Sequence, residues 1–263
     1  MVERARELIR PYTTREDVVG IYVVGSSTRP YRDELSDYDF EVIVTDEAYA
    51  ELADGEKHVF TIEDGPPRRV DHEFYLRPLS EFRRLVSSTH DLFHGPYRHA
   101  KVLHDPKGVV AETVERLALL PDKVRSARMK IHYLEIVEAI GRIKKLRHRQ
   151  QGEDRAELGV RLLAGEAVRA LCKLIFLQSG CWPPVRHWTQ QELALVDDAD
   201  QLEPVMMNVM RDPASGSCDL LMQQLNAWLS SRGETFHDDV HELFHWAFLT
   251  DDGKQSFEAW GGR

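Results

Sequence analysis

The sequence predicts an α/β (α+β) head with a small mixed sheet over residues 1–110, followed by an all-α helical bundle over residues 111–263. Two changes along the chain support this prediction. Short runs rich in valine, isoleucine and aromatic residues alternate with turn residues in the first part. Long amphipathic patterns with helical spacing dominate the second part. A chain of 263 residues suits either one large domain or two domains of ordinary size.

Four strands are expected in the head. The apolar run VVGIYVV stops before Gly25 and is typical of a buried strand. A second run begins at an acidic pair, and the turn sequence DGPP separates the third run from the fourth. The predicted strands are Val18–Val24, Tyr38–Val44, Val59–Ile62 and Arg69–Leu76. The helices predicted beside them are Val2–Ile9, Glu47–Leu52 and Leu79–Val86.

The second part is predicted to be a series of helices. The longest begins after Pro121, and a Trp-Pro-Pro sequence at residues 182–184 interrupts the pattern. The predicted helices are Lys107–Leu119, Asp122–Gln151, Asp154–Gln178, Thr189–Val196, Cys218–Ser231 and His237–Leu249. The change from strands to helices places the expected boundary near residue 110.

Composition excludes several classes of protein. The three cysteines are too few and too scattered for a disulfide framework or a zinc site, so a reduced cytoplasmic setting fits best. The first residues, MVERARELIRPY, look like a charged helical start rather than a signal peptide. No apolar run approaches the length of a membrane span. The formal net charge of -10 argues against a nonspecific nucleic-acid binder and is compatible with a small cationic partner.

The most informative segment is GSSTRPYRDELSDYD, which starts at Gly25 and ends at Asp39. A glycine at its first position lets the backbone approach a phosphate without a Cβ in the way. The Ser26 and Ser27 hydroxyls, with nearby backbone N–H groups, can bind phosphate oxygens. Arg29 can add a bidentate guanidinium. The loop between the first two strands is therefore a candidate phosphate-binding loop.

Two carboxylates stand at the start of the second strand. Asp37 and Asp39 are two residues apart, so both side chains point to one face of the strand. Paired carboxylates hold hard cations through oxygen, and paired Mg²⁺ ions can stabilise the attacking and leaving oxygens of an in-line displacement. An Asp-x-Asp pair alone is usually a solvated strand end. Its conjunction with a Gly-Ser loop between two strands favours a catalytic metal site.

The segments GSSTR and SDYDFEVIV resemble the core of the DNA polymerase β-type nucleotidyltransferase superfamily. The order of elements is similar to that of bacterial antibiotic nucleotidyltransferases, especially the kanamycin nucleotidyltransferase group. In that group Gly-Ser and the two acidic residues hold nucleotide and metal, and a third carboxylate lies on a later strand. The resemblance implies a nucleoside triphosphate, with ATP expected, and two Mg²⁺ ions. The implied metal ligands are Asp37, Asp39 and Asp71, and Glu73 is the alternative to Asp71 because it shares its strand face.

The resemblance extends into the helical part, residues 111–263, which it implies is the acceptor-binding domain. The segment EIVEAIGR, residues 135–142, is similar to part of the first long C-terminal helix of the group, where a glutamate acts as general base toward the acceptor hydroxyl. Glu138 matches that glutamate, and Arg142 lies one turn further on, where the group carries a cationic phosphate contact. Helical spacing places Glu135 on the same face, and a solvated charged face is the alternative interpretation.

The predicted function is transfer of a nucleoside monophosphate from a nucleoside triphosphate to a hydroxyl of a small-molecule acceptor, with release of pyrophosphate. An aminoglycoside-like antibiotic is the leading acceptor, which implies a role in antibiotic resistance, and no membrane or nucleic-acid partner is expected. One alternative is transfer to tRNA or protein, as in toxin–antitoxin systems, which the basic run RIKKLRHR at residues 142–149 would suit. Another is an inactive nucleotide-binding partner protein, against which the complete set of carboxylates argues.

Overall fold

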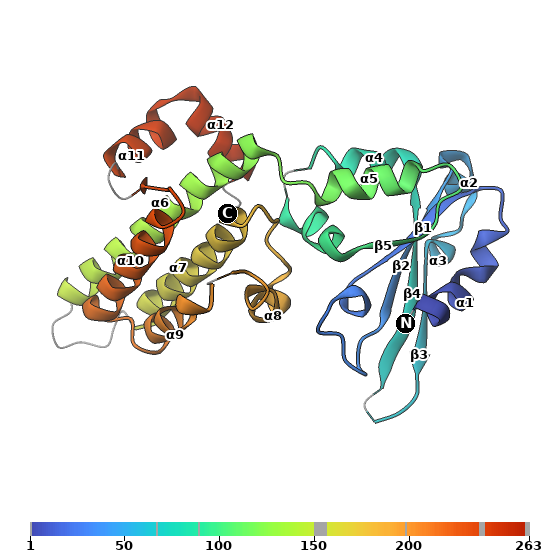
Figure 1. Ribbon diagram of the computed structural model, residues 1–263, viewed down its shortest axis with the longest axis horizontal. Helices are drawn as coiled ribbons and strands as arrows, with labels where there is room; N and C mark the ends of the chain where they lie inside the picture. Colours follow the sequence, from blue (N-terminus) through green and yellow to red (C-terminus); the bar gives the residue numbers. More distant parts are fainter. Residues whose placement is uncertain are drawn as a thin grey trace. The chain divides into compact units, whose positions relative to one another are not determined.

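A computed structural model describes residues 2–66, 68–88, 90–149, 157–197, 199–236 and 240–260 (Figure 1). The chain forms two compact units, Met1–Leu119 and Leu120–Arg263. The first unit contains a five-stranded sheet with flanking helices, and the described residues of the second unit form helices and loops. The predicted fold class, a small mixed sheet followed by a helical region, is therefore confirmed. The units divide after α5 (Val109–Ala118), whereas the expected boundary near residue 110 precedes most of that helix.

The sheet is mixed and has the strand order β3-β4-β2-β1-β5. β2 and β4 are parallel, and the other neighbouring strands are antiparallel. The strands are β1 (Val18–Val24), β2 (Tyr38–Val44), β3 (His58–Glu63), β4 (Arg69–Pro78) and β5 (Lys101–His104). The first two have the predicted bounds. β5 was not predicted, because its four residues are too few to show an alternating pattern.

The two faces of the sheet bury different cores. Every second residue of β2 from Tyr38 to Val44 is buried together with Ile9 of α1 (Val2–Thr13). The residues between them point to the opposite face. There Ile43 is buried with side chains of α4 (Leu79–Leu85) and α5. In Figure 1, α1 lies against one face of the sheet, and α4 with α5 lies against the other. Asp39 shares the second face, because it alternates with the residues that face α1.

Short elements complete the first unit. α2 (Asp46–Glu51) is capped by Thr45, whose hydroxyl accepts a hydrogen bond from the amide of Ala48. A second short helix, α3 (Asp54–Lys57), leads into β3. The single-turn helices are η1 (Ser26–Thr28), η2 (Asp91–Phe93) and η3 (Gly95–His99). Of these, η1 is the one that contains the two serines of the candidate phosphate-binding loop between β1 and β2.

The second unit has its own core. α6 (Asp122–Arg149) and α7 (Glu157–Gln178) are its longest helices, and they bury the apolar residues of one common cluster. The further helices are α8 (Thr189–Leu193), α9 (Glu203–Arg211), α10 (Ser215–Ser230), α11 (Val240–Leu249) and α12 (Asp251–Trp260). Single turns lie at η5 (Arg186–Trp188) and η6 (Ala199–Gln201). The predicted helix ends at Gln151, Asp154 and His237 lie outside the described residues.

Among the described helices of the second unit, α9 and α12 were not predicted. α9 contains a proline in its first turn, a position that tolerates proline although the residue usually marks a break. α12 begins with Asp-Asp-Gly, which is typical of a turn. A Cβ on Gly253 would lie 1.9 Å from the carbonyl oxygen of Trp246, so α12 needs glycine where it passes α11. This close backbone approach is a tertiary feature that local sequence does not reveal.

Candidate functional site

Gly25 lies directly against the carboxylate of Asp39. Its φ of 76° is in the left-handed region that favours glycine. A Cβ added to it would lie 1.6 Å from Asp39 Oδ2. The glycine of the motif is therefore required by both its backbone conformation and the space that Asp39 occupies. This contact joins the end of β1 to the start of β2.

The two serines of the loop face different partners. The residues of η1 and Arg29 are buried, with Ser26 7% exposed and Ser27 fully buried at 0%. Ser26 Oγ donates to Asp37 Oδ1 over 3.1 Å, whereas Ser27 Oγ donates to the carbonyl oxygen of Val24 over 3.4 Å. Ser26 thus connects the loop to the acidic pair, and Ser27 closes the loop on β1. Their predicted role in holding phosphate stays a prediction.

Asp39 lies among other carboxylates on the second face of the sheet. It pairs with Glu73 across the parallel β2–β4 ladder, so the two side chains share that face. Burial, the charge of Asp37 and a hydrogen bond with Glu73 raise the pKa of Asp39 to about 8. This raised pKa favours the protonated form of Asp39 at neutral pH. We call Asp37, Asp39 and Glu73 the carboxylate group.

Asp71 is directed elsewhere by a β-bulge. In the β3–β4 ladder Thr61 pairs with His72 and the next residue, Ile62, pairs with Val70, which leaves Asp71 as the extra residue of β4. Its carboxylate accepts hydrogen bonds from Arg4 of α1 over 2.6 Å and from His72 Nδ1 over 2.9 Å. Burial raises its pKa, but the bonds from His72 and Arg4 outweigh burial and leave that pKa lowered.

The bulge separates the two candidates for the third carboxylate. Arg4 belongs to α1, and its guanidinium lies 5.9 Å from the ring of Tyr38, on the face that α1 covers. Asp71 is therefore bound toward the α1 face, while Glu73 lies beside Asp39 on the other. The assignment of Asp71 as a metal ligand stays a prediction, and the geometry favours the alternative, Glu73.

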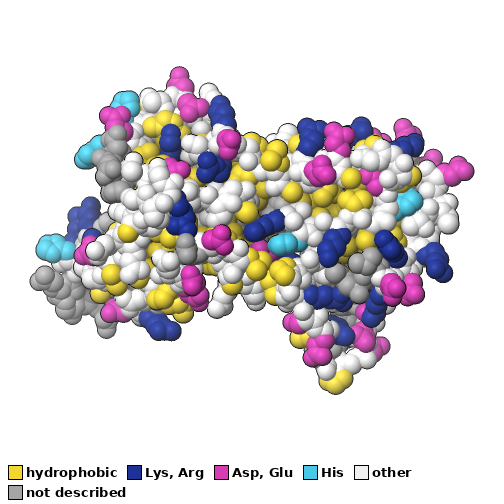
Figure 2. Space-filling view, in the orientation of Figure 1, with side chains coloured by type: hydrophobic (Ala, Val, Ile, Leu, Met, Phe, Trp, Pro, Cys, Tyr) yellow, Lys and Arg dark blue, Asp and Glu magenta, His cyan; other side chains and the backbone are white. Residues whose placement is uncertain are grey.

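Cations gather on the loop side of Asp39. Arg29 is close enough to Arg98 and Asp39 for their charges to act on it, although burial has the largest effect and leaves the pKa of Arg29 lowered. Burial and the charges of Arg29, Arg98 and Lys101 lower the pKa of His99 to about 4. Figure 2 shows Lys and Arg side chains in several patches on the visible face of the first unit. Sequence reasoning missed Arg98 and His99, because η3 and β5 had no recognisable pattern.

The side chains predicted to act on the acceptor lie on α6 in the second unit. Glu138 and Arg142 form an ion pair one helical turn apart, with 45% and 63% of their side chains exposed. Glu135 instead accepts from His132 Nδ1 over 2.7 Å, and His132 is 3% exposed. The predicted roles of Glu138 and Arg142 stay predictions.

The carboxylate group matches Mg²⁺ in its donor atoms but not in their present arrangement. Among the described residues, no group of three or more His, Cys, Asp or Glu side chains is arranged to hold a metal ion. The oxygen ligands nevertheless suit a hard cation. The raised pKa of Asp39 also reflects repulsion from Asp37 and Glu73 that a bound cation would relieve. The residues present therefore fit Mg²⁺ in chemistry, and their side chains would have to adjust to bind it.

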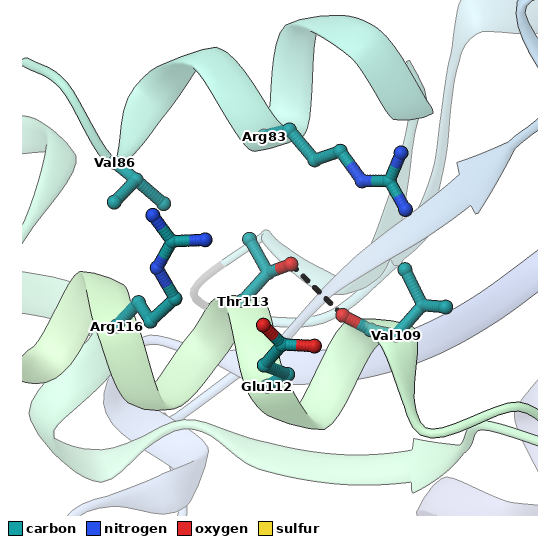
Figure 3. A pocket seen from close by; sticks show the side chains of 6 residues that line it. All are labelled: Arg83, Val86, Val109, Glu112, Thr113 and Arg116. Atoms are coloured by element: carbon teal, nitrogen blue, oxygen red, sulfur yellow. Dashed lines mark hydrogen bonds between the residues drawn. The ribbon is translucent and has the colours of Figure 1, made fainter.

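A separate pocket lies between α4 and α5 (Figure 3). Its volume is about 240 Å³, and its lining residues are Arg83, Val86, Val109, Glu112, Thr113 and Arg116. Thr113 Oγ1 donates to the carbonyl oxygen of Val109 over 2.8 Å, and the guanidinium groups of Arg83 and Arg116 reach into the space between the helices. None of the predicted site residues lines this pocket. No helix in the described parts of the chain is long and apolar enough to span a membrane.

Comparison with known proteins gives three findings. Residues 88–189 match a family model described as "Domain of unknown function (DUF4037)". No curated protein matches the chain. Among solved structures, the crystal structure of a nucleotidyltransferase-like protein from Exiguobacterium sibiricum 255-15 is similar, with 14% sequence identity and a TM-score of 0.46. That alignment covers 98% of this chain and 78% of the other.

Proposed function

We propose that this chain is a metal-dependent nucleotidyltransferase. It would move a nucleoside monophosphate from a nucleoside triphosphate, with ATP expected, to a hydroxyl of a small-molecule acceptor and release pyrophosphate. One observation carries the proposal: the Gly25–Ser26 turn closes directly on the carboxylate group, with Gly25 against Asp39 and Ser26 bonded to Asp37. A phosphate-binding loop and cation-binding oxygens on one sheet face are what such a transfer needs.

The charged side chains around Asp39 suggest which residues would hold the triphosphate and which would hold Mg²⁺. On its loop side, Arg29 and Arg98 would hold the triphosphate, because guanidinium groups bind phosphate oxygens strongly. Asp37, Asp39 and Glu73 would hold Mg²⁺, with Asp71 as the alternative to Glu73. Bound Mg²⁺ would offset the negative charge on the reacting phosphate. Bound Mg²⁺ would also favour the ionised form of Asp39, against the raised pKa of this carboxyl group in the ligand-free protein.

Glu138 is the proposed general base for the acceptor hydroxyl. It lies on the exposed surface of α6, so it is accessible to an acceptor. Glu138 forms an ion pair with Arg142. The family resemblance implies that Glu138 acts on the acceptor hydroxyl and that Arg142 contacts a phosphate of the nucleotide. Removal of the hydroxyl proton would let the acceptor oxygen attack the α-phosphorus.

The basic run on α6, residues 142–149, favours a small acceptor over RNA, because several of its cations already form ion pairs within the protein. Lys144 forms an ion pair with Asp219, and Arg147 pairs with Glu157 over 2.8 Å. Cations that are already paired offer less charge to a phosphate backbone. An aminoglycoside-like acceptor remains the leading proposal, with tRNA or protein as the alternative.

The proposal is tested with the full chain, Mg²⁺ and each of the four common nucleoside triphosphates. Nucleotide binding is measured by calorimetry, and transfer by pyrophosphate release together with the mass of the acceptor. Aminoglycosides, nucleosides and tRNA serve as acceptors. We expect Mg²⁺-dependent binding of at least one nucleotide and a mass increase of one nucleoside monophosphate on an acceptor.

The control for this test is Asp39→Asn, which keeps the side-chain size and removes a metal-binding charge. It should lose transfer without a fall in its thermal midpoint. Absence of binding for all four nucleotides in the presence of Mg²⁺ would contradict the proposal. Equal transfer by the wild type and Asp39→Asn would also contradict it.

A further inference from the structure

Three aromatic side chains extend the carboxylate face of the sheet toward its edge. His58 pairs with Tyr75 across the β3–β4 ladder, and Phe60 pairs with Glu73. Directly opposite residues of neighbouring strands share a face, so these side chains lie on the same face as Glu73 and Asp39. We call His58, Phe60 and Tyr75 the aromatic platform.

The platform is ordered internally and open to solvent. The rings of His58 and Tyr75 stack with their centroids 3.9 Å apart and an interplanar angle of 11°. The ring of Phe60 lies 5.6 Å from that of His58. Phe60 is 53% exposed and Tyr75 is 39% exposed. Adjacent exposed aromatic residues on the edge strand β3 and its neighbour β4 leave apolar area that a ligand can cover.

The platform is continuous with the carboxylate group. His58 Nε2 lies 3.0 Å from Glu73 Oε2, so Glu73 connects the platform to Asp39. Tyr75 pairs with Glu41 across the β2–β4 ladder, so Glu41 lies on the same face of the sheet as Tyr75 and Glu73. The opposite side of Asp39 carries the Gly25 turn and the cations Arg29 and Arg98. The two sides of Asp39 thus differ in chemistry.

We infer that the aromatic platform binds the acceptor by stacking against a flat face of its ring. This inference rests on the proposed nucleotidyltransferase activity and names the side of Asp39 from which the acceptor approaches. Aromatic faces attract flat rings and cations, and the neighbouring carboxylates repel anions. The ligand class is therefore a neutral or cationic small molecule that carries a ring and a hydroxyl. Both a heteroaromatic ring and the apolar face of an amino sugar meet this description.

The platform would place the acceptor hydroxyl at the carboxylate group. There the acceptor oxygen forms a bond to the α-phosphorus, and the bond from that phosphorus to its bridging oxygen breaks. Pyrophosphate takes the bridging oxygen, and the base of the proposed function takes the hydroxyl proton. The platform itself does no chemistry, so its side chains should affect acceptor binding rather than nucleotide binding.

The test compares substitutions on the two sides of β3 and β4. Phe60→Ala and Tyr75→Ala remove platform rings, and Tyr75→Phe keeps the ring. Val59→Ala is the matched control, because Val59 is 42% exposed on the same strand and pairs with Phe74, on the other face. The probes are kanamycin, which has saturated amino-sugar rings, and adenosine, which has a heteroaromatic ring. Acceptor KM and ATP KM are measured by pyrophosphate release with Mg²⁺.

Loss of one stacking side chain should raise acceptor KM by about tenfold or more. We expect this for Phe60→Ala and Tyr75→Ala with one or both probes, while ATP KM stays within about twofold. Tyr75→Phe and Val59→Ala should behave like the wild type. Equal acceptor KM in Phe60→Ala, Tyr75→Ala and Val59→Ala would overturn the platform and leave the proposed function standing.

Acceptor binding by calorimetry separates the two proposals if no transfer occurs. It is measured with the same variants, Mg²⁺ and a non-reactive ATP analogue. Probe binding that is lost in Phe60→Ala and Tyr75→Ala but kept in Val59→Ala supports the platform even if the transfer reaction fails. Failure of both probes to bind the wild type overturns the inferred ligand class. Exposed positions such as these rarely affect folding, and thermal midpoints verify this for each variant.

Discussion

Gly25 and Asp39 depend on each other in a way that substitution can measure. Gly25→Ala should lower the free energy of unfolding by about 1–3 kcal/mol, because it combines a left-handed backbone with a collision. The added Cβ would lie 1.6 Å from Asp39 Oδ2, so the carboxylate must move. Nucleotide binding should fall as well, since the turn would no longer close on the carboxylate group. Denaturant unfolding and calorimetry provide the two measurements.

Gly108 provides a comparison for this prediction. Its φ of 73° is close to that of Gly25, and a Cβ there would meet nothing within 4 Å. Its ψ of 2° lies in the αL region, whereas the ψ of -157° at Gly25 lies in a region that is populated essentially by glycine alone, so the backbone cost at Gly25 should be the larger. Gly108→Ala should therefore carry only the backbone cost, about 1 kcal/mol. If the two variants lose the same stability and Gly25→Ala binds nucleotide normally, the contact with Asp39 is unimportant.

The raised pKa of Asp39 predicts how stability depends on pH. Its pKa of about 8 in the folded chain lies well above the ordinary value of 3.8. Between these values the folded chain holds a proton that the unfolded chain has released, so stability falls as pH rises through this window. The thermal midpoint of the metal-free wild type should decrease from pH 5 to pH 8 relative to that of Asp39→Asn. Added Mg²⁺ should reduce the difference at pH 8.

Comparing the pH dependence of the thermal midpoint in the wild type and in Asp39→Asn separates the contribution at position 39 from that of distant carboxyl groups. Carboxyl groups far from position 39 titrate alike in both proteins and cancel, so the difference between the two midpoint curves reports on Asp39 and the carboxyl groups coupled to it. Parallel curves between pH 5 and pH 8 would mean that Asp39 is already ionised in the folded protein.

At the scale of elements, the bulge in β4 decides between two carboxylates. Glu73→Gln should lower transfer by about 100-fold or more if Glu73 binds the metal, since removing one electrostatic contact of this kind typically has that effect. Asp71→Asn should keep most activity and lose about 1 kcal/mol or less, because the Arg4–Asp71 pair is partly exposed. Single-turnover transfer and thermal midpoints distinguish them. A large loss of transfer in Asp71→Asn with little loss in Glu73→Gln would instead identify Asp71 as the metal ligand.

α6 carries the prediction about the general base. Glu138→Gln keeps the side-chain size and removes the basicity, so the rate of the chemical step should fall by about 10²–10⁴-fold. Nucleotide binding should change little, because the proposed nucleotide and metal ligands other than Arg142 lie in the first unit. Glu135→Gln is the comparison, since Glu135 bonds to buried His132 on the same helix. An unchanged rate in Glu138→Gln would leave it a surface residue, and a loss in Glu135→Gln would identify the base.

At the scale of the whole molecule, each unit has a core of its own. The buried clusters of the first unit contain only residues before Leu119, and the cluster of the second begins at Leu120. Units with separate cores can unfold in separate steps. Scanning calorimetry should therefore show two transitions. Mg²⁺ with ATP should increase the free energy of unfolding for only one of these transitions. The increase should be about 2.7 kcal/mol when the ATP concentration is about 100 times its Kd.

The Asp39→Asn variant identifies the transition that responds to the ligand. Its ligand-dependent shift should disappear while both transitions remain. A single transition whose calorimetric and van't Hoff enthalpies agree would show instead that the two units unfold together.

Local sequence determined much of the fold. β1 and β2 have the bounds predicted from their apolar runs, because buried strands need continuous or alternating apolar residues. The long helices α6 and α7 followed from periodicity in the same way. The motif from Gly25 to Asp39 identified the region of the candidate site, because its glycine, serines and aspartates lie within one short segment of the sequence. These features depend on interactions within a few residues.

Tertiary structure decided how the site residues are combined. Asp71 and Glu73 are equivalent by spacing, and only the bulge opposite Thr61 and Ile62 directs them to different partners. The aromatic platform likewise depends on the β3–β4 register, which brings His58 and Phe60 beside side chains of β4. Strand register and bulges arise from pairing between distant segments. A sequence pattern specifies which residues alternate along a strand, but the partner strand decides what each one contacts.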